Sequence, residues 1–254
     1  MALFTDGPIS SLEDLTAQDS QLFDVATVEG IDVTRKMTLA QEEIGQELVT
    51  FINRLHFVDQ PFWIAPQPSL RAVVVTAALK LWHISRTLEM IYSDAYSSQL
   101  NDRYGAKRDQ FHAAAQLACE KLIQIGIGVT SQPIPKAATP QVIAIPGSLP
   151  DGIYYVTMAW VNSAGEEGAS AVPEVTALAA SAFQVLPATP PPTAVSWNIY
   201  CGHAPEGMVL QNLSPIPIGE IWLQTGALAQ AGRRPGSGQE PNYLKPIPRV
   251  LQRG

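Results

Sequence analysis

The chain of 254 residues lacks several features that would place it in a common class of protein. Its two cysteines, Cys119 and Cys201, lie in different predicted domains, so no disulfide framework is expected. The longest apolar run, 72–79, is interrupted by Thr76 and is far too short to cross a bilayer. The first residues show neither a basic segment nor an apolar core, so we expect no secretion signal and no membrane partner.

Patterns typical of catalysis are missing as well. The histidines do not show the spacing of a metal site. The glycine cluster that begins at Gly232 lacks the lysine of a phosphate-binding loop, and no predicted helix follows it. Glu166 and Glu167 are adjacent in a predicted turn, where carboxylates are usually solvated. We therefore expect a protein that is not an enzyme and binds neither cofactor nor metal.

Basic residues are absent from one long segment. Residues 1–136 contain 11 Lys and Arg against 16 Asp and Glu, whereas residues 137–232 contain six acids and no Lys or Arg. Residues 233–254 contain five basic residues and one acid, Glu240. The total charge of −7 gives no general attraction to nucleic acid or to anionic lipid. A basic C-terminal segment thus follows an acidic domain.

The N-terminal half has the periodicity of helices. Stretch 102–129 predicts a long helix that ends at Gly126, because its apolar residues share one helical face. These residues are Tyr104, Phe111, Ala115, Ala118, Leu122 and Ile125. Further helices are expected over 38–55, capped by Thr38 and Gln41, and over 70–99, with short pieces over 11–16 and 20–28. Joined by short connections, they predict an antiparallel helical bundle over residues 1–136.

The pattern changes to short β-rich runs after a proline-containing linker near residue 136. Seven runs are expected to be strands: 141–145, 153–161, 171–178, 182–186, 195–201, 208–213 and 218–224. In the clearest one, Tyr154, Val156, Met158 and Trp160 share a face. The runs predict a small antiparallel β-sandwich over residues 137–232. The expected fold class is therefore α+β in two domains, followed by an extended basic arm over residues 233–254.

The charged start of the helix over 102–129 is one candidate for binding. Arg103, Lys107, Arg108 and Asp109 have no opposite charge three or four residues away. Their partners are therefore water, another helix or another subunit. A solvated helix face and a subunit contact are equally good interpretations. A second candidate is the acidic β domain, although solubility alone is enough to explain its charge.

The C-terminal arm is the third candidate. A disordered tail would not ordinarily contain so many apolar residues spaced by prolines, whereas an arm that orders against a partner explains both features. The arm residues assigned to this interface are Arg233, Arg234, Tyr243, Leu244, Lys245, Ile247, Arg249, Leu251 and Arg253. A disordered tail and a nucleic-acid-binding tail stay open, although the arm lacks the aromatic density of single-strand binders.

Several segments resemble parts of phage proteins. The segment NDRYGAKRDQFHAAAQLACEKLIQIGIGV resembles the last helix of head–tail adaptor (connector) proteins of tailed bacteriophages. The segments YYVTMAWVNSAGEEGASA and WNIYCG resemble fibronectin-III or immunoglobulin-like modules of phage virions. The segment QEPNYLKPIPRVLQRG resembles the arms by which adaptors reach a neighbouring ring. The helical resemblance covers roughly residues 10–130, and the added sandwich departs from the minimal adaptor, which is a bundle alone.

The resemblance implies a structural virion protein, made in the host cytoplasm and located in the neck at the head–tail junction. It implies a homo-oligomeric ring of about twelve copies, a dodecamer, which needs heterologous contacts that close. The ring would bind the portal protein, extend the DNA channel without binding DNA specifically, and dock tail or neck proteins. A different function stays open: a carbohydrate- or surface-binding module of a tail fibre or baseplate, with exposed aromatics such as Tyr155, Trp197 or Trp222.

Overall fold

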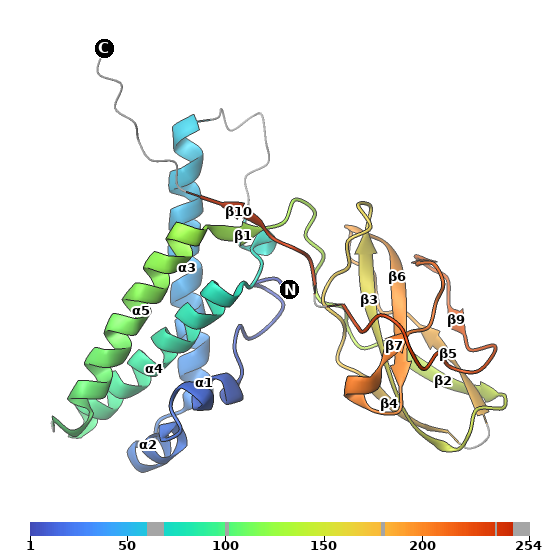
Figure 1. The fold of residues 1–254 in the computed structure, drawn as a ribbon, viewed down its shortest axis with the longest axis horizontal. Coiled ribbons are helices and arrows are strands. Elements are labelled where there is room, and N and C mark those ends of the chain that lie inside the picture. Colours follow the sequence, from blue (N-terminus) through green and yellow to red (C-terminus); the bar gives the residue numbers. More distant parts are fainter. Residues whose placement is uncertain (60–68, 100–101, 179–180, 237, 246–254) are drawn as a thin grey trace. The chain divides into compact units, whose positions relative to one another are not determined.

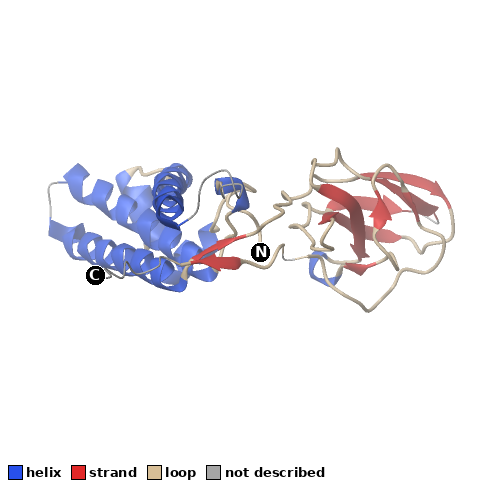
Figure 2. Cartoon of the chain, turned by 90° about the horizontal axis from the view of Figure 1, so that it is seen from above, coloured by secondary structure: helices blue, strands red, loops and turns tan. Residues whose placement is uncertain are grey.

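A computed structural model describes residues 1–59, 69–99, 102–178, 181–236 and 238–245. These residues form a mixed α+β structure with five α-helices and antiparallel sheets (Figures 1 and 2). The chain divides into two compact units. The helical unit comprises Gly7–Val129 and the residues from Pro241 onward, and the β unit comprises Met1–Asp6 and Thr130–Glu240.

This division differs from the expected boundaries at residues 136 and 232. The first six residues belong to the β unit, where the Lys136 amide donates to the Asp6 carboxylate at 2.8 Å. The expected arm is divided between the units after Glu240. The chain therefore passes from one unit to the other three times, after Asp6, Val129 and Glu240.

Three long helices form most of the helical unit. Its elements are α1 (Leu12–Gln18), α2 (Leu22–Glu29), α3 (Val33–Asp59), η1 (Leu70–Ala72), α4 (Ala77–Gln99), η2 (Asp102–Tyr104) and α5 (Gly105–Ile125). Helix α4 packs against both α5 and α3. Buried residues from all five described α-helices form one core, including Leu15, Leu22, Met37, Leu88, Ile91, Tyr92 and Phe111. No helix in the described ranges has the length and apolar character needed to cross a membrane.

Side-chain caps mark the first turns of α1, α3 and α4. Ser11 and Asp14 form a capping box at the start of α1. The predicted start of α3 at Thr38 is wrong. Its hydroxyl donates to the Thr34 carbonyl at 3.1 Å, within the helix, and the first turn is capped by Asp32, which accepts from the Arg35 amide at 3.0 Å.

The predicted helix over 70–99 is interrupted. Only a 3₁₀ turn forms at its start, and Val73 and Val74 then pair with the strand β1 (Ile127–Val129): the Val74 amide donates to the Gly128 carbonyl at 2.9 Å. The run of β-branched residues from Val73 to Thr76 favours this extended backbone over a helix. Helix α4 begins after it, where the Thr76 hydroxyl accepts from the Leu79 amide at 3.3 Å.

Helix α5 ends where the sequence predicts. Gly126 follows it with a φ of 107°, which favours glycine. The expected buried face is confirmed except at Ile125, which is 47% exposed. Ile125 lies in the final turn and at the edge of the apolar stripe, so the prediction that it is part of the core is wrong.

A two-stranded sheet closes the helical unit. Strand β1 pairs antiparallel with β10 (Asn242–Leu244), and Ile127 lies opposite Leu244. The two backbones approach closely at Gly128, where a Cβ atom would lie 2.8 Å from Pro241 Cβ and 2.7 Å from Thr76 Cγ2. The expectation that the arm lies outside both domains is therefore wrong for residues 242–244, which form part of the helical unit.

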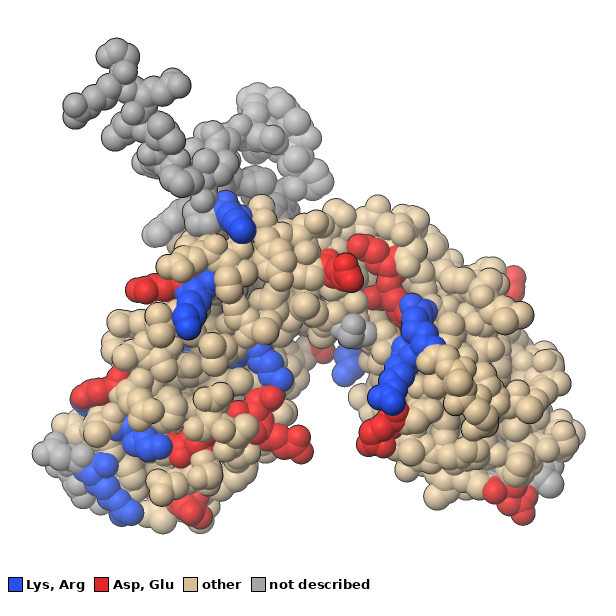
Figure 3. Space-filling model, in the orientation of Figure 1, with Lys and Arg blue, Asp and Glu red and all other residues tan. Residues whose placement is uncertain are grey.

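Two antiparallel sheets form the β unit. One contains β2 (Gln141–Pro146), β5 (Ser181–Leu186) and β9 (Trp222–Leu223). The other has the order β4 (Glu174–Leu178), β3 (Gly152–Asn162), β6 (Ala194–Gly202) and β7 (Val209–Leu210), and β8 (Ile216–Pro217) also pairs with β6. Both sheets contribute to one core. Figure 3 shows broad areas of this unit without charged side chains.

The strand predictions are confirmed best in the centre of the β unit. Tyr154, Val156, Met158 and Trp160 of β3 are all buried, and Trp160 lies opposite Trp197 of β6. The expected strands over 208–213 and 218–224 are much shorter in the structure. Each retains two paired residues, because proline and Gly219 interrupt the regular backbone around them.

One buried histidine connects three parts of the helical unit. The Nε2 atom of His83 lies 2.9 Å from the Met37 carbonyl, so it carries a proton and donates. Its Nδ1 atom accepts from the Ser10 hydroxyl at 2.8 Å. Burial lowers the pKa of His83 below its usual value, and the bond to Met37 opposes this only in part. The folded chain therefore holds His83 neutral.

We expect this histidine to make the helical unit less stable in mild acid. As the pH falls below the usual histidine pKa of about 6.5, the unfolded chain gains a proton that the folded chain does not, so the free energy of unfolding decreases. Urea unfolding between about pH 7.5 and 5.5 measures this. His83→Gln can form the same two bonds but cannot titrate. The wild-type loss should shrink in this variant, and an equal loss in both would contradict the assignment.

Candidate functional site

Lys107 has a partner within the chain. Its Nζ atom lies 3.0 Å from Oδ2 of Asp19, the C-terminal cap of α1. The same oxygen accepts from the Tyr92 hydroxyl at 2.5 Å. Burial alone would raise the pKa of Asp19, but the bonds from Tyr92 and Lys107 hold it below its usual value. Lys107 therefore connects α5 to the end of α1. Of the three expected kinds of partner, its partner is another helix.

The other charged residues at the start of α5 contact near neighbours. Arg108 pairs with the adjacent Asp109, with 2.8 Å between Nη2 and Oδ1, and its guanidinium lies 4.2 Å from the ring centre of Tyr96. The guanidinium of Arg103 lies 5.3 Å from the ring centre of Tyr104. The inference that these charges find their partners off the helix is therefore wrong for Asp109, whereas Arg108 has both a partner on its own helix, Asp109, and one on α4, Tyr96. A subunit contact at these residues stays a prediction.

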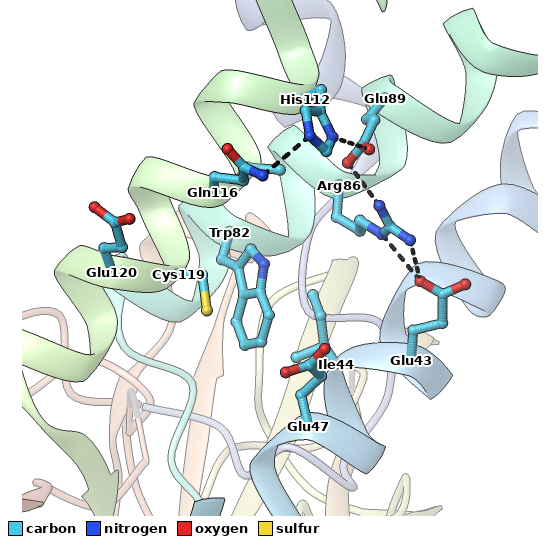
Figure 4. Close-up of a pocket in the computed structure, with 11 residues that line it drawn as sticks. Glu43, Ile44, Glu47, Trp82, Arg86, Glu89, His112, Gln116, Cys119 and Glu120 are labelled. Carbon is cyan, nitrogen blue, oxygen red and sulfur yellow. Dashed lines mark hydrogen bonds and ion pairs between the residues drawn. The ribbon is translucent and has the colours of Figure 1, made fainter. Parts of the chain in front are cut away.

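A groove that the sequence did not suggest lies between α3 and α5, with α4 as its floor (Figure 4). Its volume is about 460 Å³. Helix α3 contributes Glu43, Ile44 and Glu47, helix α4 contributes Trp82, Arg86 and Glu89, and helix α5 contributes His112, Ala115, Gln116, Cys119 and Glu120. On each helix these residues are spaced by three, four or one, which is the pattern that could have indicated a shared face.

Arg86 is the centre of a polar network in this groove. Its Nη2 atom lies 2.6 Å from Glu43 of α3, and its Nη1 atom lies 2.7 Å from the buried Glu89 of α4. Glu89 also lies 2.7 Å from Nδ1 of His112 on α5. The Gln116 amide donates to Nε2 of His112 at 3.0 Å, so Nδ1 carries the proton and donates to Glu89. The network thus joins all three helices.

The end of the groove near Cys119 is acidic. Glu47 lies on α3, Glu120 lies next to Cys119 on α5, and no described basic side chain pairs with either carboxylate. Burial, followed by these two carboxylates, raises the pKa of the Cys119 thiol. A protonated thiol is a poor nucleophile, so this end suits a cation with an apolar neighbour better than covalent chemistry. Within the described ranges, no cluster of side chains could hold a metal ion.

The first arm residue, Arg233, binds the β unit. Its Nη1 atom lies 2.7 Å from Oε2 of Glu167, which is 8% exposed and also accepts from the Tyr200 hydroxyl. The expectation that Glu167 is solvated is wrong, because it forms a bridge with Val161 and is covered there. Burial raises the pKa of Glu167, opposed by Tyr200, Arg233 and Asn198.

Gln239 anchors the arm more firmly, and the sequence did not single it out. It is 2% exposed, and its Oε1 atom accepts from the Ile134 amide at 2.7 Å. Its Nε2 atom lies 3.0 Å from the Thr130 hydroxyl and 2.8 Å from the Gln132 carbonyl and from Glu166. This residue fastens residues 130–134 to the arm.

The remaining predicted interface residues have mixed surroundings. Arg234 and Lys245 are exposed, Tyr243 is 47% exposed and Leu244 is half-buried in β10. Ile247, Arg249, Leu251 and Arg253 lie outside the described residues. Among the aromatics proposed for a carbohydrate platform, Trp197 is fully buried, so its inclusion is wrong. Tyr155 and Trp222 are half-buried and lie in different sheets.

No known protein-family model matches the chain, and no curated protein is similar to it in sequence.

Proposed function

We propose that the chain is a structural virion protein of a tailed bacteriophage, a head-to-tail adaptor that forms a ring beneath the portal protein. The single observation that carries this proposal is the anchoring of the arm. Strand β10 fastens the C-terminal segment to the end of α5, so the basic and apolar residues 246–254 start from a fixed point. An anchored segment of this composition is well suited to reach a neighbouring protein.

In this proposal, the helical unit is an antiparallel bundle, and the β unit is an immunoglobulin- or fibronectin-III-like sandwich inserted between β1 and β10. The strand order supports the second assignment. Strands β3, β6 and β7 are adjacent, as are strands C, F and G of an immunoglobulin fold, and β3 carries the buried Trp160 at the level of the core.

The helical unit also offers two unlike faces for a head-to-tail contact. The acidic groove lies on one side of the α4–α5 pair, and an apolar furrow of about 210 Å³ lies on another. Leu81 and Leu117 line the furrow and are 39% and 51% exposed. A closed ring requires contacts between different surfaces of successive copies, and exposed leucines beside a furrow suit such a contact.

The full chain alone should assemble into particles whose mass is a multiple of 27.4 kDa, or it should form a larger complex when mixed with its portal protein. Light scattering coupled to size-exclusion chromatography measures the mass, and electron microscopy shows whether the particles are rings. Leu117→Glu should abolish assembly by placing a charge in the apolar furrow. Leu213→Glu is the matched control, because Leu213 is fully exposed in the β unit.

Two outcomes would count against the proposal. One is a chain that stays monomeric with and without the portal protein. The other is specific signal on a glycan array together with no assembly, which would favour the alternative of a carbohydrate- or surface-binding module.

A further inference from the structure

The polar network around Arg86 neutralises only part of the groove between α3 and α5. Arg86 pairs with Glu43 and Glu89, which also line the groove. Glu47 and Glu120 line it as well, and within the described residues neither carboxylate pairs with a basic side chain. The groove therefore keeps two uncompensated negative charges, which attract a cation.

These two charges act on the same point, the thiol of Cys119. Burial raises the pKa of this thiol most, followed by Glu47 on α3 and then by Glu120, its neighbour in the sequence. The carboxylate of Glu47 therefore acts across the groove, and a cation beside Cys119 is attracted by both. A metal ion would need more oxygen ligands, and the described residues contain no cluster that could hold one. An organic ammonium or guanidinium group suits this position better.

Trp82 is a second and independent sign of a ligand. It is 7% exposed and lines the groove, and its indole N–H has no hydrogen-bond partner among the described residues. Figure 4 shows the indole in the groove, with its six-membered ring toward Glu47 and its nitrogen on the side of Arg86. A buried indole N–H usually finds an acceptor. An oxygen atom of a ligand in the groove supplies the acceptor that the chain itself does not.

The charges of the groove determine what kind of oxygen fits. Four carboxylates line the groove, so an acidic ligand would be repelled and the acceptor for Trp82 is a neutral oxygen. Arg86 favours the oxygen at its end, and Glu47 favours the cation at the other. The indole ring between them offers an apolar and cation–π surface. The groove volume of about 460 Å³ lies in the usual range for small-ligand sites, about 300–1,000 Å³.

We infer that the groove binds an organic cation that carries a neutral oxygen, with its ammonium or guanidinium group at Glu47 beside Cys119 and its oxygen accepting from Trp82. A lysine or arginine residue of another protein has this chemistry, because its backbone carbonyl is a neutral oxygen. A free amino alcohol has it as well. This inference goes beyond the proposed function, since it needs neither a ring nor a portal protein.

Isothermal titration calorimetry of the full chain tests the class of ligand. One probe is N-acetyl-lysine methylamide, which represents a protein side chain, and the other is linear aminopentanol, which represents a free amino alcohol. At least one should bind saturably, and the tighter of the two identifies the source. N-acetyl-norleucine methylamide lacks the ammonium group and should bind about tenfold more weakly than the lysine probe. Pentylamine lacks the oxygen and should bind several-fold more weakly than aminopentanol.

Variants of the full chain locate the site. Glu47→Gln should weaken the binding of the cationic probes about tenfold, and Glu120→Gln should weaken it less. Glu42→Gln is the matched control, because Glu42 is exposed on α3 and does not line the groove. Trp82→Phe keeps an aromatic ring but removes the N–H, so it should weaken the oxygen-carrying probes more than pentylamine. Circular dichroism and thermal melting confirm that each variant is folded.

Three results would overturn the inference. The first is that neither cationic probe binds the full chain. The second is that Glu47→Gln and Glu42→Gln bind the probes equally well. The third is that Trp82→Phe weakens pentylamine as much as the oxygen-carrying probes, which would remove the oxygen from the class of ligand. The ring test is independent of all three, because it depends on particle mass and on Leu117.

Discussion

Truncation of the chain after Gly232 is expected to destabilise both units strongly, whereas truncation after Lys245 should leave both folded. The first truncation removes Arg233 and Gln239 from the β unit and the whole of β10 from the helical unit. It leaves the buried Ile134 amide without its acceptor. The second truncation removes only residues beyond β10 and keeps each of these contacts.

The expected size of the effect follows from Gln239. Each hydrogen bond contributes about 1 kcal/mol, and a buried donor left without a partner costs about 1–3 kcal/mol, so loss of this side chain alone should cost about 3–5 kcal/mol. A typical domain is stable by only about 5–15 kcal/mol. Urea unfolding followed by tryptophan fluorescence and circular dichroism measures the difference.

The variant Gln239→Ala in the full chain removes the buried side-chain amide of Gln239 while β10 stays in place. It therefore measures the contribution of this amide alone. Gln230→Ala is its control, because Gln230 is exposed and its side chain donates to the nearby Leu228 carbonyl. If both truncated chains unfold at the same urea concentration as the full chain, the arm is not part of either unit.

The contacts of residues 233–245 also explain why the sequence predicted an arm outside both domains. Residues 233–245 contain little periodicity, so local patterns predict an arm without contacts. Gln239 binds Thr130, a residue 109 positions away, and β10 pairs with a three-residue strand just as distant in the chain. Pairing over such a distance depends on the whole fold and leaves no local trace.

The elements themselves were largely predictable where one physical pattern dominates. Alternating apolar residues predict which β3 side chains are buried, and a glycine predicts the end of α5. Both features depend only on residues that are close in the sequence. Thr38 is a position where the local pattern misled. Its spacing to Gln41 fits a helix N-cap, yet the helix begins earlier and Asp32 caps it. Ile125 is a second such position. Periodicity predicts which face of the helix it lies on, but not whether another element covers that part of the face.

The candidate groove was not predictable for a related reason. Its residues are ordinary polar positions on three helices, and only the packing of α3 and α5 beside α4 brings them together. The mixed charges of Glu43, Arg86 and Glu89 are typical of solvated helix faces. The partner of Lys107 was hidden in the same way, because Asp19 lies 88 residues earlier in the chain.

Replacement of Asp19 decides whether the start of α5 stabilises its own chain. Asp19→Ala should lower the free energy of unfolding by about 2–4 kcal/mol, because the buried Tyr92 hydroxyl loses its acceptor and Lys107 loses its counter-charge. The control Asp109→Ala should cost less than about 0.5 kcal/mol, since the side chain of Asp109 is 70% exposed and exposed ion pairs contribute little.

The same two variants separate a structural role from an interface. Chemical unfolding of the isolated chain reports on stability, and light scattering of the assembled protein reports on subunit contacts. If Asp19→Ala leaves unfolding unchanged, the bonds among Asp19, Tyr92 and Lys107 do not hold α1 in place. If Asp109→Ala impairs assembly while unfolding is unchanged, Arg108 and Asp109 belong to the subunit contact. In that case, Lys107 is the charged residue at the start of α5 that stabilises its own chain.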